Sequence, residues 1–398
     1  MGVGPTETQS VIRCSPSRPR GSRPFKRQLL DNLKNIPGWH TKEKLVVFAV
    51  DDYGNVRLDS KAARDRMAAS GVELRGRFDH LDALETRQDL EALLEALSSV
   101  SDSRGRHAVF TPYALCANPD FKAMAQNDQG YQYESLTRSF ERLAADQPAA
   151  YEGAWSLWQE GIRAGLLRPQ FHGREHLNVE LLERKLRAGD RALKINIENV
   201  SMAGLGEDPS LPRVGFTHGF GLWERSETTR HRAIIADGLK LFEQVFGFRS
   251  KTFTPPAQKL HPELYPFMEA QGVRGIHKPL YCVQRLDRDK TVREFNRLGR
   301  RRGQGHVSIV RNVVFEPNND PAFDSVGHAL NQVAAAFRWR KPAIISSHRV
   351  NFCGHIEENN RRFGLDALRR LLQGIVQRWP DVQFISADDL VERIDPAA

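Results

Sequence analysis

The sequence predicts an α/β protein in which parallel strands and helices alternate to form a (β/α) barrel. Short apolar segments of strand length are separated by longer amphipathic segments, an alternation typical of βα units around a parallel sheet. We count about nine such steps, a number that suits a barrel better than an open sheet. Several of the strands are followed at once by Asp or His, and such folds collect their catalytic groups at the carboxyl ends of the strands.

The clearest strand is residues 44–50, KLVVFAV, in which six consecutive apolar residues follow a lysine. A run of this kind is typical of a strand that is buried on both faces. Asp51 and Asp52 follow directly. Two adjacent carboxylates repel each other, so a cation or a proton has to neutralise one of them. We therefore expect one aspartate to bind a metal ion and the other to act as a base.

The remaining elements are expected from apolar periodicity and from turn residues. Besides a lead-in helix at residues 25–38, the expected helices are residues 60–70, 86–100, 151–167, 178–188, 228–246, 262–271, 324–338 and 365–379. The expected strands are residues 107–113, 169–171, 193–197, 251–256, 273–277, 307–315, 342–347 and 382–386. Segments 121–151 and 201–223 show little periodicity, and we expect them to be loop excursions from the barrel.

Charge is unevenly distributed along the chain, whose net charge is +9. Residues 1–27 contain six Lys or Arg and one acidic residue, Glu7, and are rich in Ser, Pro and Gly. This composition predicts a basic, disordered N-terminal tail, with an organelle transit peptide as the alternative. Residues 28–398 show no internal linker and are expected to form one catalytic domain.

The expected location is the cytoplasm. No stretch of the sequence is apolar for long enough to form a transmembrane helix, and the first thirty or so residues lack the apolar core of a secretory signal. The four cysteines are widely scattered, which favours reduced thiols over a disulfide framework.

A second candidate metal motif follows the short strand at residues 169–171. His172 and His176 are separated by three residues, a spacing that lets both imidazoles bind one ion. The same segment also fits the H-x-x-E-H pattern of certain metallopeptidases, with Glu175 as the general base. That alternative needs a regular helix, which Gly173 and Pro169 disfavour.

In their order along the chain, these motifs resemble those of the polysaccharide deacetylase family, carbohydrate esterase family four, with its NodB-homology domain. The family has a strand ending in Asp-Asp, a His-x-x-x-His motif, a Phe-Arg-Pro-Pro type motif and a final strand ending in His. The matching positions are Asp51-Asp52, His172 to His176, Phe253-Thr254-Pro255-Pro256 and His348. The resemblance extends from about residue 44 to about residue 390 and implies a distorted (β/α) barrel.

The resemblance also implies roles for individual residues. Asp52, His172 and His176 would bind the metal ion, usually zinc, with cobalt or nickel sometimes in its place. Asp51 would be the general base, and His348 the general acid. These roles agree with the chemistry of amide hydrolysis, which needs a Lewis acid, a base for water and a proton for the leaving amine.

Some positions depart from the family pattern. Thr254 replaces the arginine that orients the base in the family, and no Asp-containing fourth motif is identified. We expect Pro255 and Pro256 to line the substrate site. Arg311 and Arg349 are candidates for binding the substrate or for positioning work equivalent to that of the fourth motif.

The predicted function is therefore that of a metal-dependent carbohydrate N-deacetylase, a hydrolase that removes an N-acetyl or other N-acyl group from an amino sugar or glycan. The alternatives are an H-x-x-E-H metallopeptidase or other amidohydrolase, and a non-catalytic carbohydrate-binding relative. Together with Arg311 and Arg349, the eight Lys and Arg residues in 285–302 suggest that the substrate is anionic or carrier-linked. They lack the aromatic interleaving of a nucleic-acid site, so no nucleic-acid partner is expected.

Overall fold

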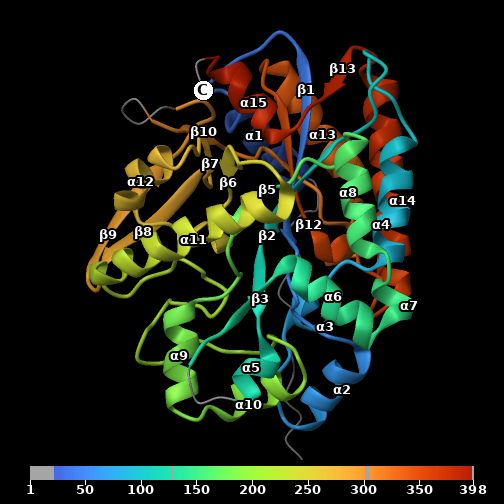
Figure 1. Cartoon of the computed structure of the whole chain (residues 1–398). Coiled ribbons are helices and arrows are strands. Elements are labelled where there is room, and N and C mark those ends of the chain that lie inside the picture. The colour runs from blue at the N-terminus through green and yellow to red at the C-terminus, as the bar shows by residue number, and fades with distance from the viewer. Residues whose placement is uncertain (1–21, 127–129, 301–304, 397–398) are drawn as a thin grey trace, which may run out of the picture.

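A curled sheet of nine parallel strands forms the centre of the computed structural model, which describes residues 22–126, 130–300 and 305–396 (Figure 1). The strand order is β10-β7-β6-β5-β2-β1-β12-β11, and β13 pairs with β1. The bounds are β1 (Lys44–Tyr53), β2 (Phe110–Leu115), β5 (Gln170–Gly173), β6 (Thr252–Phe253), β7 (Gly275–His277), β10 (Val307–Ile309), β11 (Val313–Val314), β12 (Ala343–His348) and β13 (Val382–Phe384). The prediction of a distorted (β/α) barrel is confirmed: the parallel sheet curls into a half-barrel.

The two edge strands of the sheet follow each other in the sequence. Strand β10 pairs with β7 and strand β11 with β12, and only residues 310–312 lie between them. The expected long strand at 307–315 is thus divided into two strands. Its central residues, 310–312, pair with no strand and connect β10 to β11. Asn312 holds this connection to β12, since its side-chain oxygen accepts a hydrogen bond from the Ile344 amide at 2.8 Å. The neighbouring residue, Arg311, is thereby placed beside the carboxyl end of β1.

Two hydrophobic cores pack on opposite faces of β1, because successive side chains of a strand alternate between its faces. Leu45, Val47 and Ala49 belong to a small core inside the curl of the sheet, to which α15 (Ala387–Ile394) also contributes. Val46, Phe48 and Val50 belong to the larger core that lies under the surrounding helices. Both faces of β1 are therefore buried, as the apolar run 44–50 predicts.

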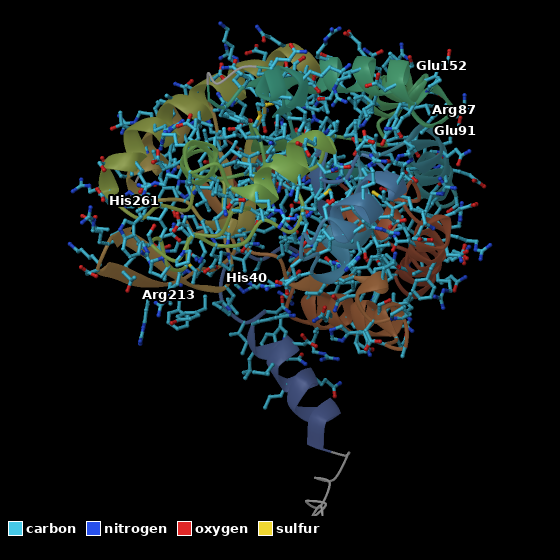
Figure 2. The ribbon with its side chains drawn as sticks, turned by 90° about the horizontal axis from the view of Figure 1, so that it is seen from below. His40, Arg87, Glu91, Glu152, Arg213 and His261 are labelled. Carbon is cyan, nitrogen blue, oxygen red and sulfur yellow. The ribbon has the colours of Figure 1, made fainter. Side chains whose placement is uncertain are left out.

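The outer helices largely follow the sequence periodicity. They are α1 (Ser22–Leu33), α4 (Arg87–Ser98), α8 (Ala154–Arg163), α11 (Thr228–Phe246), α12 (Tyr265–Ala270), α13 (Ser325–Arg338) and α14 (Glu358–Arg378). Helix α11 has the predicted bounds and ends at Gly247, whose φ of +79° suits glycine. Helix α1 begins inside the region assigned to the basic tail and extends from the body of the molecule (Figure 2). The rest of that predicted tail, residues 1–21, lies outside the described residues.

A group of short elements lies at the carboxyl ends of the strands, below the sheet in Figure 1. It consists of α2 (Lys61–Ala69), α3 (Gly76–Leu81), β3 (Ala117–Pro119), α5 (Phe121–Gln126), β4 (Tyr133–Ser135), α6 (Leu136–Asp146), α7 (Pro148–Tyr151), α9 (Val179–Arg187) and α10 (Arg191–Glu198). The strand expected at 193–197 is wrong, since these residues lie in α10. Leu193 and Ile197 are buried four residues apart, on one side of that helix.

An antiparallel hairpin of β8 (Tyr281–Asp287) and β9 (Lys290–Phe295) was not expected from the sequence. It lies outside the main sheet and contains many charged residues, which hide the strand pattern. Among the described residues, no helix is long and apolar enough to cross a membrane. Cys116, Cys282 and Cys353 are free thiols. The cytoplasmic location stays a prediction.

Candidate metal and acid–base site

Asp51 and Asp52 both lie at the carboxyl end of β1, and each is less than a tenth exposed. Asp51 continues the alternation of Leu45, Val47 and Ala49, so its side chain faces the interior of the curl. Asp52 has a φ of +73°, a left-handed conformation that Asp tolerates better than most residues. The pairing of β1 with β2 shifts register at the same point. This break in the strand turns the second carboxylate toward β5.

Asp52 meets His172 and His176 at the end of β5. One oxygen of Asp52, Oδ1, lies 3.2 Å from Nε2 of His172 and 3.1 Å from Nε2 of His176. The ligand atoms of the three residues all lie within 4.8 Å of one another. Ligand atoms that are each about 2.0–2.2 Å from one zinc ion stand about 3 Å apart, so these spacings fit a shared ion. The structure thus brings together the three residues that the sequence proposed for a metal.

The hydrogen bonding of His172 supports a cation at this position. Its Nδ1 lies 2.6 Å from the carbonyl oxygen of Thr254, which can only accept, so Nδ1 carries a proton. In a neutral ring Nε2 then presents a lone pair to the Asp52 oxygen. Two lone pairs in contact require a proton or a cation between them, and a divalent ion satisfies both. Metal-binding histidines are usually oriented in this way, with the ring nitrogen that does not bind the metal donating to a carbonyl or a carboxylate.

Even with no ion present, Asp52 is held in its charged form, which is the form that binds a metal ion. Burial alone would raise the pKa of the Asp52 carboxyl, but the fields and hydrogen bonds of His176 and His172 outweigh burial and hold the pKa well below its usual range. The Nδ1 atom of His176 is buried and has no hydrogen-bond partner among the described residues. Two imidazoles and one carboxylate are ligands that suit zinc and related divalent ions.

The H-x-x-E-H alternative does not fit the structure. Residues 172 and 173 end strand β5 and the chain then turns, so no helix presents the two histidines. Glu175 is buried and forms an ion pair with Arg174, at 2.5 and 2.9 Å. The metallopeptidase alternative does not fit, because no helix presents the two histidines and Glu175 is not among the groups gathered with them at the cluster.

Arg311 holds Asp51 through two parallel hydrogen bonds. Both of its terminal nitrogens lie 2.6 Å from the two Asp51 oxygens. One of them also donates to the hydroxyl of Thr254, at 3.0 Å. The guanidinium expected at position 254 is thus supplied by Arg311, from the connection between β10 and β11. Arg311 therefore positions the carboxylate, and its contact with substrate stays a prediction.

Behind Arg311, a buried pair of rings fixes the guanidinium. The Arg311 Nε donates to Nδ1 of His277 at 3.0 Å. The other ring nitrogen of His277 lies 2.5 Å from the hydroxyl of Tyr113. Burial, followed by the charge of Arg311, holds the pKa of His277 well below its usual value, so the ring is neutral and can accept this hydrogen bond. Nothing in the local sequence around His277 or Tyr113 pointed to this role.

His348, at the end of β12, is placed opposite Asp51, its register partner on β1. Its Nε2 lies 4.0 Å from an Asp51 oxygen, and its Nδ1 lies 2.6 Å from Oε1 of Glu316. Burial alone would lower the pKa of His348, but the hydrogen bond and charge of Glu316 outweigh it and raise the pKa to about 9. The ring is therefore protonated near neutral pH. Glu316 is itself bound by Arg77 and Asn351.

Glu316 was missed in the sequence. It directly follows Phe315, just beyond β11, so a carboxylate after an apolar strand was the available signal. That signal is weak, because the strand is only two residues long and the partner histidine lies 32 residues away. The carboxylate that binds His348 thus comes from Glu316 and not from an Asp-containing motif.

One expected substrate contact, that of Arg349, does not fit the structure, and those of Pro255 and Pro256 stay predictions. Arg349 is buried and forms ion pairs with Asp82 and Glu85, at 2.8 and 2.9 Å, so it cannot reach a substrate. Pro255 and Pro256 are also buried. Pro256 packs beneath Gly173 and Gly219, where added Cβ atoms would lie 3.5 and 3.1 Å from its ring. Its role is to pack the loop against the end of β5.

Comparison with known proteins finds likeness in structure only. No family model matches the chain, and no curated protein matches its sequence. A solved chain from Mycobacterium smegmatis, described as a polysaccharide deacetylase, is 12% identical, with 90% of this chain and 93% of that chain covered and a TM-score of 0.44. The family 4 carbohydrate esterase from Streptomyces lividans is 11% identical, with 86% and 91% covered and a TM-score of 0.32.

The likeness is not limited to deacetylases. The 4-alpha-glucanotransferase from Thermococcus litoralis is 8% identical, with 88% of this chain but 40% of that chain covered, at a TM-score of 0.43. The resemblance to polysaccharide deacetylases that the motifs suggest is thus found again among solved structures. Similarities this distant carry no argument about the reaction, which has to be argued from the geometry of the site.

Proposed function

We propose that this protein is a metal-dependent hydrolase that removes the N-acetyl group, or a related N-acyl group, from an amino sugar. One observation carries the proposal. The Asp52, His172 and His176 cluster lies at the carboxyl ends of the strands. Asp51, held by Arg311, and His348, held by Glu316, lie at the same end of the sheet. This is the set of groups that amide hydrolysis requires.

A divalent ion held by Asp52, His172 and His176, most simply zinc, would supply a Lewis acid for the acyl carbonyl. Asp51 is the general base in this proposal. The two hydrogen bonds from Arg311 leave the carboxylate little freedom to rotate. A water molecule between Asp51 and the acyl carbon can therefore give up its proton to a fixed acceptor.

His348 is the general acid. Since Glu316 keeps the ring protonated on the Nδ1 side, Nε2 presents its proton toward Asp51 and the site. The leaving amine needs one proton when the C–N bond breaks, and a protonated imidazole with a pKa of about 9 carries that proton at neutral pH. Asp51 and His348 lie on paired strands, so both act on one substrate group from neighbouring positions.

The carbohydrate part of the proposal rests on the order of motifs along the chain. The test is metal analysis of purified protein, followed by acetate release from a panel of N-acetylated sugars and of other amides. We expect bound divalent metal in the native protein, its loss in His176→Ala, and acetate release from one or more sugars. Metal-loaded protein that releases acetate from no sugar would contradict the proposal, and sugar binding without any release would favour the non-catalytic alternative.

A matched control separates the peptidase mechanism from this one. Glu175→Gln should retain acetate release, because Glu175 pairs with Arg174 and takes no part in the proposed reaction. If Glu175→Gln instead removes activity while metal content and melting temperature are unchanged, Glu175 takes part in the reaction and the roles assigned to Asp51 and His348 are wrong.

A further inference from the structure

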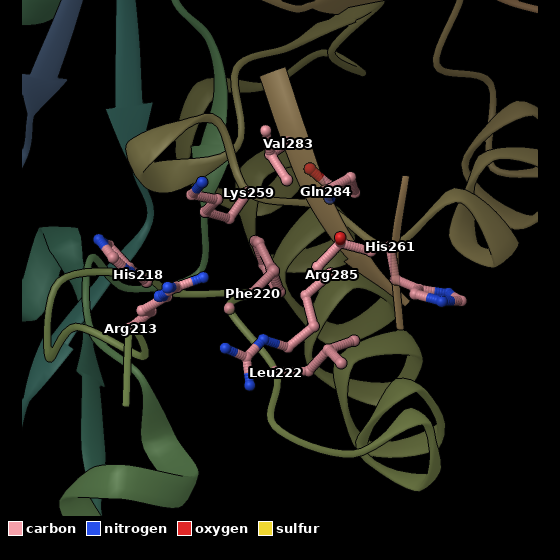
Figure 3. A pocket seen from close by; sticks show the side chains of 11 residues that line it. Arg213, His218, Phe220, Leu222, Lys259, His261, Val283, Gln284 and Arg285 are labelled. Carbon is pink, nitrogen blue, oxygen red and sulfur yellow. The ribbon is translucent and has the colours of Figure 1, made fainter. Parts of the chain in front are cut away.

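A basic pocket lies between the β8–β9 hairpin and the loop at residues 213–222 (Figure 3). Three cationic side chains, Arg213, Lys259 and Arg285, line it together with His218, and no Asp or Glu lines it. Its volume is about 210 Å³, smaller than the ~300–1,000 Å³ of a typical site for a complete small molecule. The pocket is therefore of a size to hold one substituent of a larger ligand.

Two acidic residues near this pocket are already paired with other arginines. Glu224 forms an ion pair with Arg288, and Glu263 with Arg225. In contrast, no described residue forms an ion pair with any of the three cations that line the pocket. Their charge is thus not neutralised by an ion pair, which favours the binding of an anion.

Arg285 is the most strongly fixed of the three. Its guanidinium lies 4.5 Å from the centre of the Trp223 ring, and Nη2 donates to the carbonyl of Pro212 at 3.0 Å. Its Nη1 is buried and has no hydrogen-bond partner among the described residues. A buried donor without a partner is unfavourable, and an anion at the pocket wall can accept a hydrogen bond from it.

His218 adds a neutral donor. Its Nδ1 accepts a hydrogen bond from the Gly215 amide at 2.8 Å, so in the neutral ring the proton is on Nε2. Burial, and then the charge of Lys259, lower the pKa of His218 and keep it in this neutral form. In Figure 3, His218, Arg213, Lys259 and Arg285 lie around Phe220, which supplies an apolar wall.

The basic pocket shares wall residues with cavities that lie closer to the metal cluster. His218 also lines a second cavity, of about 440 Å³, together with Thr217 and Arg57. Thr217 and Arg57 in turn line the small cavity that contains His176. These shared residues place the basic pocket on the His176 side of the metal cluster.

We propose that the basic pocket binds a phosphate group of the substrate, so that the amino sugar deacetylated at the metal cluster is a phosphorylated or diphosphate-linked one. A phosphate monoester carries a charge of about −1.5 to −2 near neutral pH, which suits three uncompensated cations better than a single carboxylate does. This substrate assignment rests on the proposed function, whereas the binding of phosphate in the pocket does not.

The first test measures binding without catalysis. Inorganic phosphate is titrated at constant ionic strength into the native protein, Arg213→Gln, Lys259→Gln and the double variant, with calorimetry as the readout. We expect each single change to weaken binding about threefold and the double change about tenfold. The control is Arg378→Gln, which removes an exposed charge at the end of α14, remote from the hairpin in Figure 1, and should bind like the native protein.

Melting temperatures of all variants show that they are folded, and Arg285 is left intact because it packs on Trp223. Equal phosphate binding by the native protein and the double variant overturns the proposal. So does an equal loss in Arg378→Gln, since the effect would then be one of net charge.

The second test identifies the source of the phosphate. N-acetylglucosamine, its 6-phosphate and its uridine diphosphate conjugate are compared as substrates of the native protein and the double variant. We expect the double variant to raise KM for one of the two phosphorylated compounds, with kcat and the turnover of the neutral sugar unchanged. Equal effects on all three compounds overturn the proposal. If the double variant loses phosphate binding and no compound is deacetylated, the pocket stands and the proposed function fails.

Discussion

Arg311 and Arg349 form the same kind of contact in two different surroundings. Each guanidinium is less than a tenth exposed and pairs with carboxylates, Arg311 with Asp51 and Arg349 with Asp82 and Glu85. Arg311 lies on the interior side of the curled sheet, beside the metal cluster. Arg349 follows His348 in the chain and turns the opposite way, into the layer of helices.

The partners of the two arginines explain what this difference means. Glu85 also accepts hydrogen bonds from the Trp158 side chain at 2.9 Å and the Gly54 amide at 3.2 Å, so the Arg349 cluster joins a helix to the turn after Asp52. Asp51 has oxygens that face His348 and the site. We therefore expect the ion pairs of Arg349 to affect mainly the stability of the fold. The ion pair of Arg311 should affect mainly the rate of the reaction, although both arginines form buried ion pairs of the same type.

The largest expected effect is on folding. Arg349→Ala leaves Asp82 and Glu85 as buried carboxylates without their cation, and breaking a buried pair in this way costs about 3–5 kcal/mol of unfolding free energy. Denaturant unfolding followed by tryptophan fluorescence measures it. Arg369→Ala, which removes a more exposed pair with Glu95, should change the free energy by less than about 0.5 kcal/mol. If the unfolding free energy changes by similarly small amounts in both variants, the buried ion pairs of Arg349 do not stabilise the fold.

The next effect is on the rate. Asp51→Asn keeps the size of the side chain but removes the base, so we expect acetate release to fall by about a hundredfold or more. Metal content and melting temperature should stay close to those of the native protein, because Asp52, His172 and His176 are intact. Single-turnover rates measured on metal-loaded protein give the comparison. Near-native turnover by Asp51→Asn would remove the proposed mechanism.

Arg311→Ala tests the comparison directly. Loss of the two hydrogen bonds frees the Asp51 carboxylate to rotate, and we expect the rate to fall by about tenfold or more. Arg311→Lys restores the charge but not the planar fork, so it should recover only part of the rate. If Arg311→Ala instead lowers the melting temperature while the rate per folded molecule is unchanged, Arg311 is structural like Arg349.

The smallest effect is a shift in pH dependence. Glu316→Gln removes the charge that raises the pKa of His348 to about 9, so the alkaline limit of the rate should move down toward the ordinary histidine value of about 6.5. The raised pKa also stabilises the fold below about pH 6.5, and this contribution is lost as pH rises through about 9. The stability difference between native protein and Glu316→Gln should thus be large near pH 6 and small above pH 9. A difference independent of pH would exclude the His348 pairing as its cause.

Much of the fold follows from local patterns. The run 44–50 is apolar at every position after the lysine, which only a strand buried on both faces allows, and this placed Asp51 and Asp52 at a sheet edge. Helix α11 was predicted at its observed bounds because its periodicity and its terminal glycine agree. The prediction at 193–197 was wrong because its apolar residues alternate as in a strand. The buried residues of this segment, Leu193 and Ile197 among them, lie on one side of a helix.

By itself, the sequence determined most of the central strands and outer helices, the aspartate pair and the two histidines, because each depends on residues close together in the chain. Only the tertiary structure decided which charges meet. Arg311 reaches Asp51 across 260 residues because the two edges of the sheet return to each other at residues 310–312, and Arg349 is excluded from the site because it turns to the other face of β12. Pairings of this kind depend on how the sheet curls, a property of all nine strands together that no local pattern records.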